Sequence, residues 1–183
     1  SNAPVYLRTH PLTVERISDM QNRAQNSPYR QVVSSLDFYL VRAKIRAQTG
    51  TAREAVSEAE TALREKKYAS QAAARYGLAF ALMRAKDIAG AQREMDAIRS
   101  LKVSSPLISG LAADIRSATG DLPAAQEIYR DALLRFPQAK SLVYGYAESL
   151  YAGRQYAQAL QFLESQLQLS LSDYKLYGLQ AKT

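Results

Sequence analysis

The stretch Gly120-Asp-Leu-Pro-Ala-Ala-Gln-Glu-Ile-Tyr-Arg-Asp-Ala-Leu-Leu-Arg-Phe-Pro137 has the pattern of one helix between two stop signals. Gly120 and Asp121 supply a tight turn and a helix start, and Pro137 closes the segment. Between them, apolar residues recur at helical spacing: Leu122, Ala125, Ile128, Tyr129, Ala132 and Leu133. One such helix cannot bury its apolar face alone, so the stretch predicts packing against further helices.

The same pattern returns at a fixed period along the chain. Ala91 and Ala159 lie 34 residues before and after Ala125, and most other apolar positions also stay apolar under this shift. Ala55 lies 36 residues before Ala91, which indicates a two-residue insertion around Lys66-Lys67-Tyr68. In this upstream copy, the places of Gly120, Ala125, Tyr129, Ala132 and Leu133 are taken by Gly50, Ala55, Ala59, Ala62 and Leu63.

A 34-residue period of paired helices resembles the tetratricopeptide repeat, over roughly residues 36–183. The match is strongest in residues 120–137; no copy has the tryptophan often seen in the first helix, and Lys86 and Arg154 replace the turn glycine. The resemblance implies an all-α, right-handed α-α superhelix of about four helix pairs, preceded by one N-terminal helix. It also implies a concave groove lined by the first helix of each pair.

The repeat register divides the chain. Residues 1–3 resemble the remnant of a cleaved tag, so we expect the chain to be cut from a longer protein. Residues 4–35 contain a helix from Thr13 to Ala24 and a connector. The expected repeats follow at 36–69, 72–105, 106–139 and 140–173, with a partial helix at 174–183. Their expected helices are 36–48, 52–66, 71–85, 88–101, 106–119, 120–137, 140–151 and 156–169.

The composition agrees with a helical chain, because Gly and Pro number only 8 and 6 among 183 residues. An excess of 24 basic over 17 acidic side chains gives a net charge of +7. These charges are spread along the chain, which favours solvated helix faces, and we expect no nucleic-acid partner. The absence of cysteine excludes disulfides and thiolate metal sites. No apolar run approaches the about 20 residues of a membrane span.

A second resemblance lies in Leu7-Arg-Thr-His-Pro-Leu-Thr-Val-Glu-Arg-Ile17. This segment is similar to the one that follows the catalytic core in HtpX-type zinc metallopeptidases. The continuation through Asp19, Asn22-Arg23-Ala24 and Ser34-Ser35-Leu36-Asp37-Phe38-Tyr39 resembles the BepA-like (YfgC-like) branch, in which tetratricopeptide repeats follow the peptidase domain. The resemblance implies that residues 4–35 come from the end of such a domain. It further implies a periplasmic parent that acts in outer-membrane protein assembly or quality control.

The chain itself cannot be that peptidase. A zinc peptidase of this type needs His-Glu-x-x-His, whose two histidines bind the metal while the glutamate acts as general base. The chain has one histidine, so we expect no catalytic residue and no cofactor here, and zinc only in the parent. The resemblance implies that His10 is an extra, removable zinc ligand in a closed state of the parent. Alternatively, Thr9-His10-Pro11 only shapes a loop, which is what we expect of the isolated chain.

The register also selects side chains of the first helices that packing does not use. Residues four apart stand one above another on a helix, and Tyr, Phe and Arg are favoured interface anchors. The predicted partner-binding groove therefore contains Tyr76, Phe80, Arg84, Asp114, Tyr144, Glu148 and Tyr151. The alternative is that the aromatic residues are core, which we expect for about half of them. The Lys/Asn pair with which some tetratricopeptide domains clamp a terminal carboxylate is absent.

Two functions remain open at this point. The first is a protein-binding module that docks substrates or partners for a zinc metallopeptidase and regulates it. Its partners would be an extended protein segment or the protein's own peptidase domain. The second is a free-standing basic scaffold, without a protease, that recruits acidic proteins.

Overall fold

The computed structural model describes residues 13–26, 34–169 and 178–180. Helix α1, Thr13–Asn26, belongs to one compact unit, and all later helices belong to another. The side chains of Val14, Ile17 and Met20 lie on the predicted apolar face of α1 and are exposed. Of the predicted partial helix at 174–183, residues 178–180 are helical, and the rest lies outside the described residues.

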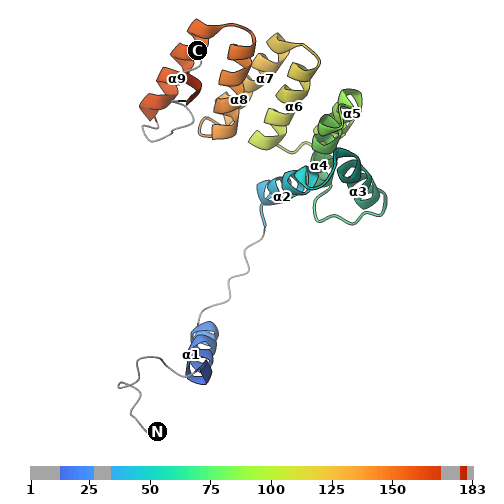
Figure 1. Cartoon of the computed structure of the whole chain (residues 1–183), viewed down its shortest axis with the longest axis vertical. Coiled ribbons are helices and arrows are strands. Elements are labelled where there is room, and N and C mark those ends of the chain that lie inside the picture. Colours follow the sequence, from blue (N-terminus) through green and yellow to red (C-terminus); the bar gives the residue numbers. More distant parts are fainter. Residues whose placement is uncertain (1–12, 27–33, 170–177, 181–183) are drawn as a thin grey trace. The chain divides into compact units, whose positions relative to one another are not determined.

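The second unit is a series of helices joined by short turns (Figure 1). Each predicted helix is present with closely similar ends, and the described residues contain no strand. The helices are α2 (Leu36–Gln48), α3 (Ala52–Arg64), α4 (Gln71–Arg84), α5 (Ile88–Ser100), α6 (Pro106–Ala118), α7 (Leu122–Arg135), α8 (Lys140–Ala152) and α9 (Tyr156–Leu169).

The helices pack in the order expected of a superhelix of repeats. The pairs α4 with α5, α6 with α7, and α8 with α9 contact each other, and each second helix also contacts the next first helix. The first helices α2 and α4, and likewise α6 and α8, lie side by side. The predicted all-α superhelix of paired helices is therefore confirmed.

Polar side chains set the helix starts. Ser35, Thr51, Ser70, Asp87 and Asp121 each accept a hydrogen bond from the backbone amide three residues later. Each bond satisfies an amide that has no partner within the helix, and such caps stabilise a helix by about 1 kcal/mol. These caps explain why five of the helices, α2, α3, α4, α5 and α7, begin where the sequence predicts.

The turns inside the pairs share one left-handed backbone conformation. Gly120 has φ +82° and Gly50 has φ +66°. Lys86 and Arg154, which stand at the same position of their repeats, have φ 66° and 56°. A residue with a Cβ pays roughly 1–2 kcal/mol for this conformation. The two helix pairs that have Lys86 or Arg154 in place of the glycine thus adopt the same left-handed turn.

Small residues at the helix crossings let the helices approach closely. The alanines of the repeat, Ala91, Ala125 and Ala159, are all 0% exposed. A Cβ at Gly77 of α4 would lie 3.2 Å from the Cβ of Ala43, so its absence lets α2 sit tightly on α4. Both α2 and α3 pack on α4 and contact each other less closely.

Candidate functional site

A hollow with a cavity volume of about 150 Å³ lies along the first helices α4, α6 and α8, with Lys44 of α2 at one end. We call it the groove. Its other lining residues are Tyr76, Phe80, Pro106, Leu107, Gly110, Leu111, Asp114, Tyr129, Ser141, Tyr144, Gly145 and Glu148.

The structure brings most of the predicted groove residues together. Tyr76, Phe80, Asp114, Tyr144 and Glu148 all line this hollow. Their spacing explains why, because residues that occupy one register position of successive repeats line up on one face. Phe80, Asp114 and Glu148 occupy one such position, 34 residues apart, and Tyr76 and Tyr144 belong to another.

Tyr76 forms the wall of the groove from inside the core. Its side chain is 2% exposed and packs within the cluster that joins α4 to its neighbours. Burial, with a smaller effect from the charge of Asp114, raises the pKa of Tyr76 above its usual range. The residue therefore keeps its proton and shapes the groove, with little of its surface open to a partner.

Phe80 and Lys44 form a contact across the first two repeats. The Lys44 ammonium lies 5.2 Å from the centre of the half-buried Phe80 ring. A cation over an aromatic face at this distance is attracted by about 0.5–1 kcal/mol at an exposed site. The pair places an apolar surface and a positive charge at one end of the groove.

Tyr129 forms a hydrogen bond with Asp114 from the interior of the domain. The Tyr129 hydroxyl donates a hydrogen bond to Asp114 Oδ1 at 2.5 Å, while the Tyr129 ring is 3% exposed. Burial, with the charge and hydrogen bond of Asp114 and the charge of Glu148, raises the pKa of Tyr129. The ring fits against α8 because position 145 is glycine: a Cβ there would lie 2.5 Å from the Tyr129 hydroxyl oxygen.

The Asp114 side chain is exposed to solvent. It also lines the hollow, so protein atoms lie on several sides of its carboxylate. The neighbouring atoms displace part of its water, and this raises its pKa above the ordinary 3.8 despite the Tyr129 hydrogen bond and the charge of Lys44. Asp114 and Glu148 give the groove two carboxylates against one ammonium, Lys44. The groove is thus acidic although the chain carries +7.

Two predicted groove residues lie elsewhere. Arg84 donates hydrogen bonds to the carbonyl oxygens of Ala47 and, at 3.1 Å, of Gly50, so its guanidinium holds the end of α2. Tyr151 is 42% exposed and packs edge-on against Tyr156, with ring centres 5.4 Å apart. Neither residue lines the groove.

Sequence reasoning missed Lys44, Tyr129 and Gly145. Lys44 lies 36 residues before Phe80, so the shift that aligns Ala55 with Ala91 would have placed it in the same register. The helical spacing of Tyr129 predicts a packing residue, and it does pack, but its hydroxyl also reaches the groove. No local pattern distinguishes Gly145, because its role depends on a ring from another helix.

His10, the predicted zinc ligand of the parent, lies outside the described residues. In the part of the chain that the structure describes, no three His, Cys, Asp or Glu side chains are grouped to hold a metal ion. None of the helices in that part is long and apolar enough to cross a bilayer.

Comparison with known proteins agrees with the arrangement of the helices. A family model described as "Tetratricopeptide repeat" matches residues 117–182. This part of the chain is similar to tetratricopeptide repeats, and the helix pairs have a tetratricopeptide-like arrangement. A region of 164 residues is 27% identical to the "Beta-barrel assembly-enhancing protease" of Yersinia pestis, and it covers 89% of this chain and 34% of that protein. The chain therefore spans about a third of the length of this relative.

Stacked helix pairs of this kind serve as protein-interaction modules. They present an extended concave surface to proteins or peptides. The groove described above is a hollow of this kind, since it is lined mainly by first helices.

Proposed function

We propose that the groove binds an extended protein segment, and that the chain is the substrate-docking and regulatory module of a zinc metallopeptidase. The observation that carries the groove proposal is the convergence of Phe80, Asp114, Tyr144 and Glu148, from three successive first helices, on one hollow. An extended chain has aromatic and apolar side chains for the rings of Phe80 and Tyr144, and it has backbone amides or basic groups for the two carboxylates.

The link to a peptidase rests on the similarity to the Yersinia pestis protein, whose name describes a protease that enhances β-barrel assembly. This similarity, together with the resemblance of the segment around His10, supports a parent protein that works in the periplasm on outer-membrane protein assembly or quality control. The groove would then receive unfolded β-barrel chains or a segment of the peptidase domain itself. Zinc and the catalytic residues belong to that domain.

A binding measurement tests the groove. The probe is a fluorophore-labelled outer-membrane β-barrel protein, unfolded in urea and diluted into buffer with the tetratricopeptide chain, and anisotropy reports binding. Tyr144→Ala and Glu148→Lys should each weaken binding about tenfold or more, because a tenfold loss corresponds to about 1.4 kcal/mol. Circular dichroism confirms that each variant is folded.

Tyr156→Ala is the matched control, because Tyr156 is an exposed aromatic residue outside the groove. It should leave binding unchanged. If the groove governs binding, affinity should fall only moderately with salt, because salt does not screen the contacts of the Phe80 and Tyr144 rings. If binding falls steeply with salt and is unchanged in Tyr144→Ala and Glu148→Lys, the proposal is contradicted and the free-standing basic scaffold is favoured.

The peptidase link has its own test. The gene region upstream of Val5 should encode His-Glu-x-x-His and a signal peptide. Their absence would contradict the link while leaving the groove proposal untouched. In a full-length parent, His10→Ala should raise proteolytic activity if His10 is a removable zinc ligand, and unchanged activity would exclude that role.

A further inference from the structure

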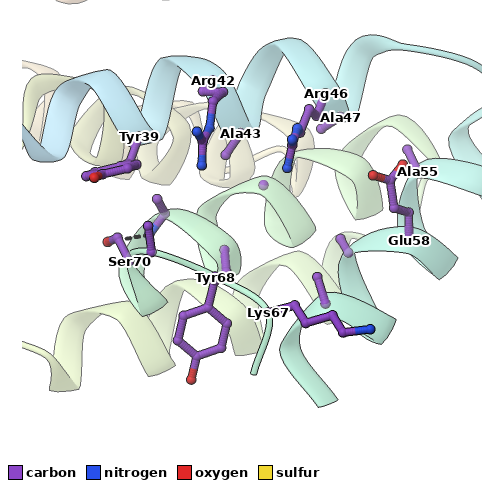
Figure 2. A pocket seen from close by; sticks show the side chains of 16 residues that line it. Tyr39, Arg42, Ala43, Arg46, Ala47, Ala55, Glu58, Lys67, Tyr68 and Ser70 are labelled. Atoms are coloured by element: carbon purple, nitrogen blue, oxygen red, sulfur yellow. Dashed lines mark hydrogen bonds between the residues drawn. The ribbon is translucent and has the colours of Figure 1, made fainter. Parts of the chain in front are cut away.

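A second hollow, separate from the groove, lies between α2, α3 and α4 (Figure 2). Its cavity volume is about 100 Å³, and it shares no lining residue with the groove. Small side chains from all three helices form its floor: Ala43, Ala47, Ala55, Ala59, Ala62 and Ala73. We call it the alanine pocket.

The pocket exists because the first repeat lacks one large side chain. Ala59 of α3 stands at the register position that Met95, Tyr129 and Leu163 occupy in α5, α7 and α9. Those three side chains are 4%, 3% and 0% exposed, so each lies in the interior. Ala59 leaves the corresponding space open.

The surrounding helices cannot close this space. The close approach at Gly77 and Ala43 holds α2 on α4, and α3 packs on α4 as well. A structure relaxes only partly around missing side-chain volume, so a hollow remains between α2, α3 and α4. An apolar floor of this kind is suited to an apolar side chain from outside.

The rim of the pocket is basic. Figure 2 shows Arg42 and Arg46 reaching from α2 into the space between the helices, with Lys67 on the opposite side. Arg42 lies over the rings of Phe38 and Tyr39, at 5.8 and 5.4 Å from their centres. Within the described residues, Arg42 and Arg46 have no carboxylate partner.

Acidic groups at the rim are fewer than basic ones. Glu58 is the acidic residue among those that line the pocket, against Arg42, Arg46 and Lys67. Lys67 pairs with Glu65 at 2.6 Å, but both side chains are exposed, and such pairs are worth little. The rim therefore attracts a partner that carries negative charge.

We propose that the alanine pocket receives one leucine- or methionine-sized side chain of an acidic protein segment. The partner's side chain fills, in the first repeat, the space that the buried Met95, Tyr129 and Leu163 side chains occupy at the same register position of the later repeats. Carboxylates next to the anchor pair with Arg42 and Arg46. The inference does not rest on the groove or on the peptidase link, because it uses other residues on other helices.

A titration followed by nuclear magnetic resonance tests this proposal. The chain is labelled with carbon-13 in its alanine methyl groups, and the probe is a blocked nonapeptide with one central leucine flanked by glutamates and alanines. The methyl signals of Ala43, Ala55 and Ala59 should shift and saturate with a Kd of about 1 mM or tighter. Replacing the leucine with alanine, or the glutamates with lysines, should abolish the shifts.

Ala59→Met fills the pocket with the residue that the second repeat carries. It should weaken peptide binding at least tenfold, while thermal unfolding occurs at the same or a higher temperature. Ala89→Met is the matched control, because Ala89 is exposed on α5 and outside the pocket. It should bind the peptide like the unaltered chain. Arg46→Glu, at an exposed position, should also weaken binding severalfold, because an attraction to the peptide carboxylates becomes a repulsion.

Several results would overturn the proposal. These are an absence of shifts at several millimolar peptide, unchanged binding by Ala59→Met or Arg46→Glu, or shifts confined to alanines outside the pocket. Equal shifts with the lysine peptide would exclude the charge argument. Shifts of the same methyl groups by a thymidine oligonucleotide, without an effect of the leucine peptide, would assign the pocket to nucleic acid instead.

Discussion

The hydroxyl of Tyr129 on α7 donates a hydrogen bond at 2.5 Å to the carboxylate of Asp114 on α6, and so connects the interior of a repeat to the groove. Tyr129 is buried, whereas Asp114 is open to solvent. A residue that packs one repeat against the next therefore also orients an acidic group of the candidate binding surface. Changes at either residue should affect both stability and the charge of the groove.

The pKa of Asp114 should exceed its ordinary value of 3.8. The neighbouring atoms that exclude water raise it, and the Tyr129 hydrogen bond and the Lys44 charge partly oppose this. Tyr129→Phe and Lys44→Met should each raise the pKa of Asp114 further. A carbon-13 titration of the carboxyl group measures this directly, and a pKa at or below 3.8 in the unaltered chain would contradict the explanation.

Asp114 should also make stability fall as pH rises. A carboxyl whose pKa is higher in the folded than in the unfolded state binds more protons when folded, between the two pKa values. The free energy of unfolding therefore decreases from about pH 3.8 up to the folded-state pKa, and is constant above it as far as Asp114 is concerned. Asp114→Asn should remove this slope. Urea denaturation at a series of pH values compares the two proteins, and parallel profiles would contradict the prediction.

Gly145→Ala should destabilise the domain. The new methyl group would lie 2.5–2.6 Å from atoms of Tyr129, and such overpacking costs typically 1–3 kcal/mol. The better helix propensity of alanine returns about 0.5–1 kcal/mol, so we expect a net loss of about 1–2 kcal/mol. Urea denaturation measures it.

Gly110→Ala is the control for this prediction. A Cβ at Gly110 would lie 3.7 Å from Leu142 Cδ2, which is an ordinary contact. The substitution should therefore be neutral or stabilising by up to about 1 kcal/mol. Equal effects of the two substitutions would show that the Tyr129 ring does not constrain α8.

Ser105→Ala should cost more than an ordinary loss of a helix cap. The 2% exposed Ser105 side chain accepts a hydrogen bond from the Leu107 amide and donates one, at 2.6 Å, to Asp37 of α2. Losing both bonds should lower the free energy of unfolding by about 2–3 kcal/mol. Ser70→Ala removes only the cap on α4 and should cost about 1 kcal/mol. Thermal and urea denaturation distinguish the two, and equal losses would mean that the bond to Asp37 contributes nothing.

Arg84→Met should destabilise the first repeat without changing groove binding. The guanidinium binds the carbonyl oxygens of Ala47 and Gly50, and their loss should cost about 1–2 kcal/mol. Arg130→Met serves as the control, because Arg130 is exposed on α7. Hydrogen exchange of the α2 amides should accelerate in Arg84→Met only. Weaker binding of the unfolded β-barrel probe at unchanged stability would instead assign Arg84 to a partner.

The repeat register could be predicted because it depends on local periodicity. Alanines 34 residues apart identified the register, and Ala91, Ala125 and Ala159 are all buried, as equivalent positions of a repeat should be. The same register placed Phe80, Asp114 and Glu148 on one face. The long side chain of Arg84 could not be placed this way, because its direction depends on carbonyl groups of another helix.

By itself, the sequence determined the helices, their pairing and the positions that face a common groove, since all three follow from spacing along the chain. Only the tertiary structure decided which of those side chains are accessible to a partner. Tyr76 is buried in the core, and Arg84 binds a carbonyl oxygen at the end of α2. The tertiary structure also decided that Ala59 borders a hollow, because that hollow forms where α2, α3 and α4 come together. Burial and cavities depend on how several helices approach one another, and no spacing within one segment records that distance.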